Sequence, residues 1–273
     1  MAGESSTVAI FGAGVMGEAL LSGLLRGEEP GHRYLITEKR PDRVAELRER
    51  YPQVEVVDNV TAAKTADVLA LVVKPQDMTA LLDEIGEHIQ EDALVVSLAA
   101  GITTTRLEES LPKSVAVVRA MPNTPAAVGR GVTGAVAGGD ADPARLRLAD
   151  ALLGAVGAVE WLDEERSIDA LTAVSGSGPA YVFYMVECLA AAGVAAGLPV
   201  EISNRIARAT VEGAGELLYR QSDVMAGTLR ERVTSPGGTT AAALAVLMGD
   251  EGLAPLMTRA VAAAQKRAGE LSG

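Results

Sequence analysis

The stretch Thr7–Leu25, TVAIFGAGVMGEALLSGLL, decides the fold of this chain. An apolar run typical of a buried strand is followed at once by a glycine-rich turn and a helix-forming segment. The turn fits G-x-G-x-x-G, in which the first glycine permits a tight turn, the second lets the backbone approach a pyrophosphate, and the third allows close helix–strand packing. A merely glycine-rich turn is the alternative. We predict a dinucleotide-binding turn made of Gly12, Ala13, Gly14, Val15, Met16 and Gly17.

Short strand-like runs alternate with helical patterns through the first half of the chain. They are TVAIF at 7–11, RYLIT at 33–37, VEVV at 54–57, VLALVV at 68–73, ALVVSLA at 93–99 and SVAVV at 114–118. Continuous Val, Leu and Ile are typical of strands buried on both faces of a parallel sheet. Two more runs, at 132–138 and 158–162, flank a helical pattern near 145–153 and should extend the sheet. We predict an α/β fold built on an N-terminal Rossmann-type doubly wound sheet.

The strand pattern stops near residue 163, and Ala-, Leu- and Val-rich helical stretches follow, with breaks at 175–179, 197–199 and 235–238. We therefore predict an NAD(P)-binding domain over 1–163 and an all-α domain over 164–273. No linker rich in Pro, Ser or Gly separates the halves, so direct docking is expected. Helical faces this rich in Ala and Leu need a partner subunit to bury them, which predicts a homo-oligomer.

Composition excludes several classes of function. Acidic residues outnumber basic ones, 36 to 24, and a net charge of −12 with no basic run argues against a nucleic-acid partner. The composition is that of a soluble domain, so no membrane partner is expected. The first residues lack a basic segment followed by an apolar one, which predicts a cytoplasmic protein. One cysteine, Cys188, and two histidines cannot supply a usual zinc set, so no metal site is predicted. Cys188 and Trp161 are expected in the core.

Residues near the end of the second strand should read the adenosine ribose. Glu38 lies roughly 20 residues beyond Gly17, where the fingerprint expects an acidic residue that favours NAD. Lys39 and Arg40 follow directly, and a guanidinium there can pair with the 2′-phosphate of NADP. A solvated turn is the alternative for all three. Asn59, after the third strand, is a further candidate for polar contact with the cofactor.

Two more segments follow strands at the carboxyl edge, where ligands of open α/β sheets bind. In Val73-Lys74-Pro75-Gln76 the proline is expected to end the strand, and Lys74 either faces the cofactor or is a surface lysine. Met121-Pro122-Asn123-Thr124-Pro125 closes the sixth strand as a stiff loop or a plain turn.

Small residues also precede two helices of the second half. Ser175–Tyr181, SGSGPAY, opens a long helix with Pro179 in its first turn, and the segment is either a capped helix start or a loop that lets the helical half meet the cofactor. Val233–Thr240, VTSPGGTT, leads into another helix. Free N–H groups, the positive end of the helix dipole and nearby hydroxyls can hold a carboxylate there, with ordinary threonine capping as the alternative.

Taken together, GAGVMG, VKPQ, MPNTP, SGSGPAY and VTSPGGTT occur in the order and approximate spacing of the pyrroline-5-carboxylate reductase family, which the chain resembles over nearly its whole length. The resemblance implies a Rossmann domain and a C-terminal helical dimerisation domain that interlocks with its partner. It also implies NAD(P)H-dependent reduction of a small imino acid, 1-pyrroline-5-carboxylate, to L-proline in the last step of proline biosynthesis. Positioning does much of such catalysis, which fits the lack of a candidate general base.

The resemblance further implies roles for individual residues. The substrate carboxylate would lie on the backbone and hydroxyls of Ser235, Gly237, Gly238, Thr239 and Thr240, with Thr240 as the catalytic candidate near the ring nitrogen. Val73, Lys74, Pro75, Met121 and Asn123 would line the cofactor. Members of the family generally use NADPH, so NADP(H) is favoured although Glu38 keeps NAD(H) open. A β-hydroxyacid dehydrogenase is a second reading, but SGSGPAY lacks the catalytic lysine expected there. A non-catalytic dinucleotide sensor would leave SPGGTT without a role.

Overall fold

The computed structural model describes residues 6–27, 32–139 and 141–272, and its contacts divide them into two compact units. One unit comprises the described residues up to Gly176 together with those from Gln265 onward, and the other is Ser177–Ala264. The first unit thus includes a short helical segment beyond residue 163, where the sequence predicts the domain boundary. The reason is that Ile168 and Ala173 of this segment are buried in the first unit.

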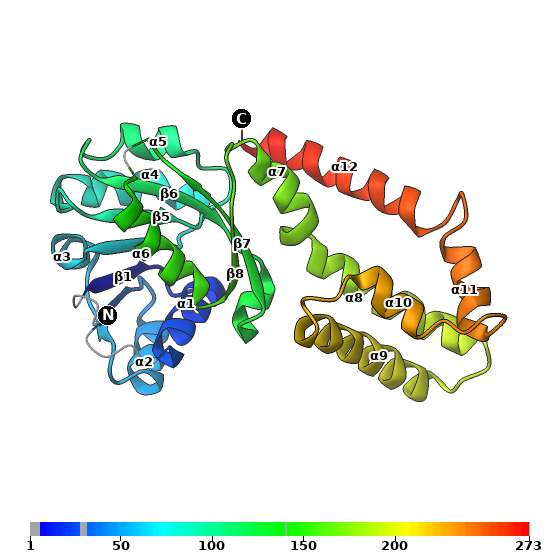
Figure 1. Ribbon diagram of the computed structural model, residues 1–273. Coiled ribbons are helices and arrows are strands. Elements are labelled where there is room, and N and C mark those ends of the chain that lie inside the picture. Colours follow the sequence, from blue (N-terminus) through cyan, green and yellow to red (C-terminus); the bar gives the residue numbers. More distant parts are fainter. Residues whose placement is uncertain (1–5, 28–31, 140, 273) are drawn as a thin grey trace. The chain divides into compact units, whose positions relative to one another are not determined.

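A single sheet of eight strands forms the centre of the first unit as described (Figure 1). Its strands are β1 (Thr7–Phe11), β2 (Arg33–Thr37), β3 (Glu55–Val56), β4 (Val68–Leu71), β5 (Leu94–Ser97), β6 (Ala116–Met121), β7 (Gly131–Ala137) and β8 (Gly157–Trp161). Their order is β3-β2-β1-β4-β5-β6-β7-β8. The strands β1 to β6 run parallel, β7 is antiparallel to β6, and β8 is parallel to β7. The predicted doubly wound sheet is confirmed, including its two-strand extension.

Helices cover both faces of this sheet. On one face lie α1 (Val15–Arg26), α2 (Pro41–Arg50) and α6 (Pro143–Gly154), and on the other lie α3 (Asn59–Thr65), α4 (Pro75–Ile85) and α5 (Thr104–Glu109). Short 3-10 turns follow α4 and β6, at η1 (Gly86–His88) and η2 (Thr124–Val128). Because side chains alternate along a strand, Ile10 packs toward the first layer while Ala9 and Phe11 pack toward the second. The apolar runs of the sequence are therefore buried on both faces.

Two predictions about single residues of this unit are wrong. Pro75 does not end a strand, because β4 already ends at Leu71 and Pro75 begins α4 with Lys74 as N-cap. The first helical position suits proline, whose missing N–H has no helical partner there. Trp161 is not in the core but is 37% exposed at the end of β8, the edge strand, where its indole N–H donates to Asp150 Oδ1 of α6 at 3.0 Å.

An ion pair between a buried arginine and a partly buried glutamate connects the chain after β8 to the sheet. Glu165 accepts hydrogen bonds from the buried Arg119 of β6 at 2.8 Å and from the backbone N–H and hydroxyl of Thr104, at the start of α5, at 2.9 and 3.0 Å. Burial works against ionisation of Glu165, but these donors outweigh it and lower the pKa of the carboxyl. The Glu165 carboxylate thereby links β6 and α5 to the segment that precedes α7 (Ser167–Leu171).

The segment SGSGPAY is not a loop. The helix α7 continues into a π-helical turn, η3 (Thr172–Gly176), and α8 (Gly178–Ala195) follows with Pro179 in its first turn, as predicted. The Ser175 carbonyl accepts a hydrogen bond from the Asn123 amide at 3.0 Å, so a side chain of the β6–β7 connection caps a carbonyl of this widened turn.

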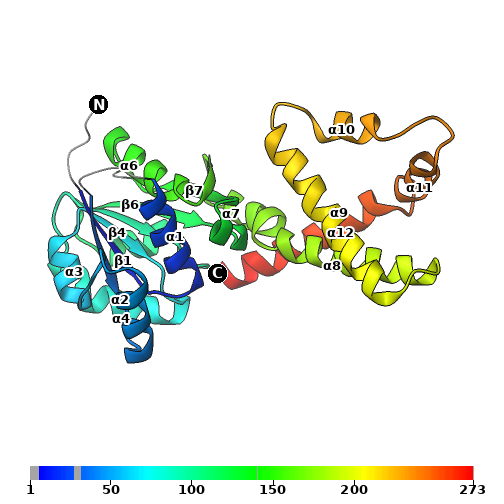
Figure 2. The same ribbon diagram turned by 90° about the horizontal axis from the view of Figure 1, so that it is seen from below.

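The second unit is entirely helical (Figure 2). Besides α8 it contains α9 (Val200–Arg220), α10 (Ala226–Arg232), α11 (Thr239–Leu247) and most of α12 (Leu253–Ser272). The breaks predicted at 197–199 and 235–238 are confirmed, whereas those at 221–225 and 248–252 were not predicted. The helices α8 and α9 pack closely, and the buried Ser203 hydroxyl donates to the Ala190 carbonyl at 2.6 Å between them.

Large apolar side chains of this unit remain exposed in the single chain. On α8 they include Val182, Phe183, Tyr184 and Met185, and neither α10 nor α11 buries a side chain within the described structure. The prediction that Cys188 is buried is wrong for the same reason, since α8 lacks a cover on that face. One described stretch, Ser167–Ala195, is long and apolar enough to cross a membrane by length and composition, and little of it is buried in the single chain.

Candidate dinucleotide-binding site

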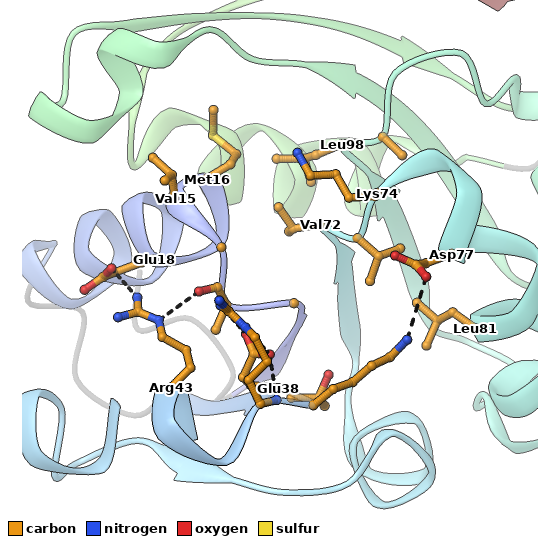
Figure 3. Close-up of a pocket in the computed structure, with 18 of the residues that line it drawn as sticks. Val15, Met16, Glu18, Glu38, Arg43, Val72, Lys74, Asp77, Leu81 and Leu98 are labelled. Atoms are coloured by element: carbon orange, nitrogen blue, oxygen red, sulfur yellow. Dashed lines mark hydrogen bonds and ion pairs between the residues drawn. The ribbon is translucent and has the colours of Figure 1, made fainter. Parts of the chain in front are cut away.

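A cleft of about 1090 Å³ opens at the carboxyl ends of β1 and β4. The strand order reverses between these two strands, and this switch point is where open α/β sheets bind ligands. Figure 3 shows Val15 and Met16 of α1 on one side of the cleft and Val72, Lys74 and Leu98 on the other. The predicted cofactor residues found in its lining are Gly12, Ala13, Gly14, Val15, Met16, Glu38, Lys39, Arg40, Asn59, Val73, Lys74 and Pro75.

The three glycines of the turn have the surroundings that a pyrophosphate cradle needs. Gly12 has φ +104°, a left-handed conformation that favours glycine, and a β-carbon there would lie 3.0 Å from the Val72 carbonyl oxygen. A β-carbon on Gly17 would lie 2.0 Å from the Gly12 carbonyl oxygen, so Gly17 serves helix packing rather than the cleft lining. Gly14 meets nothing within 4 Å and leaves open space in the cleft. The residues present therefore fit a dinucleotide.

The start of α1 adds an anion site to this cradle. Gly14 is its N-cap, no side chain caps the helix, and the first helical hydrogen bond runs from the Glu18 N–H to the Gly14 carbonyl at 2.9 Å. The N–H groups of the first turn are thus left for a ligand, and the helix dipole favours a negative one. A phosphate group matches both properties.

At the adenosine end, Glu38 and Arg40 are bonded to each other. One Glu38 carboxylate oxygen accepts from the Arg40 backbone N–H at 3.0 Å and its Nε at 3.3 Å, and the other accepts from Nη2 at 3.4 Å. Burial of Glu38 opposes its ionisation, but the hydrogen bonds from Arg40 outweigh it and lower the pKa of the carboxyl. Lys39 is the third charged residue of this turn, and its ammonium lies 3.9 Å from Asp77 of α4.

Arg43 also lines the cleft, although no sequence pattern predicts it there. Its Nε donates to the Ala13 carbonyl at 3.1 Å, and its guanidinium pairs with Glu18 and with Glu46, the latter at 2.5 Å. Glu18 in turn accepts from Arg50 and from the Tyr51 hydroxyl. Burial alone would raise the pKa of Glu18, yet these donors lower it. The network holds the glycine turn against α2, and only tertiary contact could reveal it, because α1 and α2 are separate in sequence.

Further lining residues follow β5 and β6. Leu98, Ala99 and Ala100 come directly after β5, and Thr124 and Ala127 belong to η2. Their places after strand ends were the available signal, since parallel strands bring such residues to one edge. Met121 and Asn123, predicted to line the cofactor, are not among the lining residues. The Asn123 amide donates to the Ser175 carbonyl, as described above, and accepts from the Val132 N–H at 2.9 Å.

The predicted carboxylate site lies in the second unit, at the start of α11. Gly238 is the N-cap, and no side chain caps the helix, so the threonine-capping alternative is not seen. Gly237 is left-handed, with φ +69°, and the Gly238 N–H donates to the Ser235 carbonyl at 3.0 Å. This turn directs the N–H groups of Thr239 and Thr240 to the free end of the helix.

The fold and the cleft define a Rossmann-type protein with a dinucleotide site. The family of NADP oxidoreductases, coenzyme F420-dependent, matches residues 7–101, and that of pyrroline-5-carboxylate reductase dimerisation domains matches residues 165–271. The chain belongs to the pyrroline-5-carboxylate reductase family, as its relatives show.

Curated relatives and solved structures are similar to nearly the whole length of this chain. The pyrroline-5-carboxylate reductase of Corynebacterium melassecola is 39% identical over 97% of this chain and 98% of its own, and that of Pseudomonas aeruginosa is 38% identical over 97% and 96%. The structure of the Coxiella burnetii pyrroline-5-carboxylate reductase has a TM-score of 0.92 at 36% identity, covering 99% and 100% of the two chains. The Plasmodium falciparum pyrroline carboxylate reductase, solved with NADP bound, has a TM-score of 0.77 at 26% identity over 99% of both chains.

Proposed function

We propose that the protein reduces 1-pyrroline-5-carboxylate to L-proline with NAD(P)H, the last step of proline biosynthesis, in the cytoplasm. The observation that carries this proposal is the glycine cradle, open at Gly14 and continued by the uncapped start of α1, in a chain of this family. When bound, the nicotinamide supplies the hydride. The protein's task is then to hold a planar imine and its carboxylate in place.

The substrate carboxylate is proposed to bind at the start of α11. The backbone N–H groups there, with the hydroxyls of Ser235, Thr239 and Thr240, would hold it through charge-assisted hydrogen bonds. Gly237 supports this role because its left-handed conformation shapes the turn, and Gly238 because its N–H closes that turn onto Ser235. The Thr240 hydroxyl is proposed to donate a hydrogen bond or a proton to the ring nitrogen.

For the cofactor we propose NADP(H) over NAD(H). Support comes from the two cations after β2, since the Arg40 side chain is 60% exposed at the cleft and the Lys39 ammonium has only a distant partner. A 2′-phosphate needs such accessible positive groups. We also propose a homodimer formed by the helical domain, because its apolar faces are uncovered in one chain.

The test is the fall in NADPH absorbance when 1-pyrroline-5-carboxylate is added to the purified protein. We expect turnover that Thr240→Ala lowers by roughly 10²-fold, the order expected for loss of a proton-donating group. Thr258→Ala is the matched control, because Thr258 is exposed on α12 and its hydroxyl donates only to the Ala254 carbonyl. No consumption of either reduced nucleotide would refute the reductase assignment, and equal activities of the two variants would refute the role of Thr240.

A further inference from the structure

The Glu38–Arg40 pair brings together, in one turn, the two residue types that usually select different cofactors. A carboxylate after the second strand accepts from the ribose 2′-hydroxyl of NAD, whereas an arginine nearby accommodates the 2′-phosphate of NADP. Here the Glu38 side chain is only 10% exposed and turns toward Arg40, whose guanidinium is open to the cleft. Glu38 and Arg40 are therefore already hydrogen-bonded to each other before a nucleotide binds.

Neighbouring cations differ from Arg40 in availability. Arg43 is 13% exposed and is held by two carboxylates and the Ala13 carbonyl, so its charge is already balanced. Lys39 is far more exposed, but at 3.9 Å it faces Asp77 rather than the end of β2. Of these three cations, Arg40 is thus the one that is both exposed and hydrogen-bonded to Glu38.

We infer that Glu38 and Arg40 act together as a cofactor selector, in which Glu38 competes with the 2′-phosphate of NADP(H) for the Arg40 guanidinium. With the pair closed, Glu38 still has lone pairs for a ribose hydroxyl and the turn accepts NAD(H). With the pair opened by a phosphate dianion, Arg40 exchanges a carboxylate for a more highly charged ligand. Glu38 then limits the preference for NADP(H), so the cleft accepts both nucleotides. This inference depends on one part of the proposed function, namely that the cleft binds NAD(P)H.

Equilibrium binding of 2′,5′-ADP and 5′-AMP to the full-length protein tests the competition without any turnover. Glu38→Gln should tighten 2′,5′-ADP about tenfold, the size of one charge-assisted hydrogen bond, while 5′-AMP binds equally or more weakly. Arg40→Gln should weaken 2′,5′-ADP about tenfold and leave 5′-AMP unchanged. The ratio of kcat/KM for NADPH over NADH should rise in Glu38→Gln and fall in Arg40→Gln.

Matched control variants distinguish an effect of the Glu38–Arg40 pair on nucleotide binding from an effect of the protein's net charge. Glu49→Gln and Arg48→Gln change the same charges on exposed positions of α2 outside the cleft lining, where screening should leave both affinities nearly unchanged. In an Arg40→Gln background, Glu38→Gln should lose most of its effect on 2′,5′-ADP. An unchanged 2′,5′-ADP affinity in Glu38→Gln, or a tenfold gain that persists without Arg40, would overturn the inference. Normal nucleotide binding with no imine turnover would instead refute the proposed reaction alone.

Discussion

Gly14 and Gly17 lie in the same turn but have opposite surroundings. Space around Gly14 is empty within 4 Å, whereas a β-carbon on Gly17 would strike the Gly12 carbonyl oxygen at 2.0 Å. A side chain at Gly14 would therefore extend only into the cleft, where the pyrophosphate is expected to bind. A side chain at Gly17 forces α1 away from β1, which is a folding defect rather than a binding one.

We expect Gly14→Val to raise KM for NADPH by about tenfold or more, since it blocks the phosphates, with little change in thermal stability. Gly17→Ala should lower the free energy of unfolding by roughly 1–3 kcal/mol through overpacking. Steady-state kinetics and thermal unfolding of both variants check this. The contrast fails if Gly14→Val unfolds as readily as Gly17→Ala.

Among the elements, the chain between β8 and α7 depends on one carboxylate. Glu165 joins Arg119 of β6 to the start of α5, and it sits just ahead of the helix whose π-turn meets Asn123. Because Arg119 is buried, removal of Glu165 leaves a charge without its partner, a change that costs about 3–5 kcal/mol in comparable sites. The arrangement of β6, α5 and α7 therefore depends on the ionised form of Glu165.

This dependence predicts a loss of stability in acid. The pKa of Glu165 is lower in the folded protein than in the unfolded chain, so its contribution is present above the unfolded value of about 4.3 and disappears as the pH falls through the lower folded value. Wild type should lose melting temperature more steeply below pH of about 4.3 than Glu165→Gln, whose starting stability is lower. Parallel curves for the two proteins would contradict the prediction.

At the scale of the whole molecule, the helical unit exposes many large apolar side chains in the single chain. Phe183 is 64% exposed, and its neighbours Tyr184 and Met185 on α8 are exposed as well. Exposed apolar patches of this extent mark protein interfaces. The family of pyrroline-5-carboxylate reductase dimerisation domains matches residues 165–271, which include this apolar face of α8.

Phe183→Asp should therefore shift the protein from dimer to monomer at micromolar concentration, because a carboxylate would be buried unpaired in the interface. Light scattering coupled to size exclusion gives the mass. Leu148→Asp is the control, since it places the same charge on an exposed apolar site of α6 in the first unit. A monomeric wild type, or a dimeric Phe183→Asp variant, would rule out this role for α8.

The local sequence was sufficient to predict the sheet, the glycine turn and the helical second half. Residues such as Gly12 and Gly14 could be assigned because their conformational freedom acts at the place where they stand, between a strand and a helix. Buried parallel strands likewise show themselves as continuous apolar runs. Two of the errors occurred where burial depends on distant neighbours, for Trp161 on an edge strand and for Cys188 on a helix with an uncovered face.

The sequence by itself determined the fold class, the family resemblance and the glycine-turn and strand-end residues of the cleft, since these follow from local pattern and from the meeting of strand ends at one edge. Only the tertiary structure decided which charges are free to act. The Arg43 guanidinium is already bonded to the Ala13 carbonyl, Glu18 and Glu46, and Arg40 is bonded to Glu38. The Asn123 amide is likewise hydrogen-bonded to the Ser175 carbonyl and to the Val132 N–H. The physical reason is that a hydrogen bond depends on the distance between two groups in space, and residues far apart in the chain can meet that condition as well as near neighbours do.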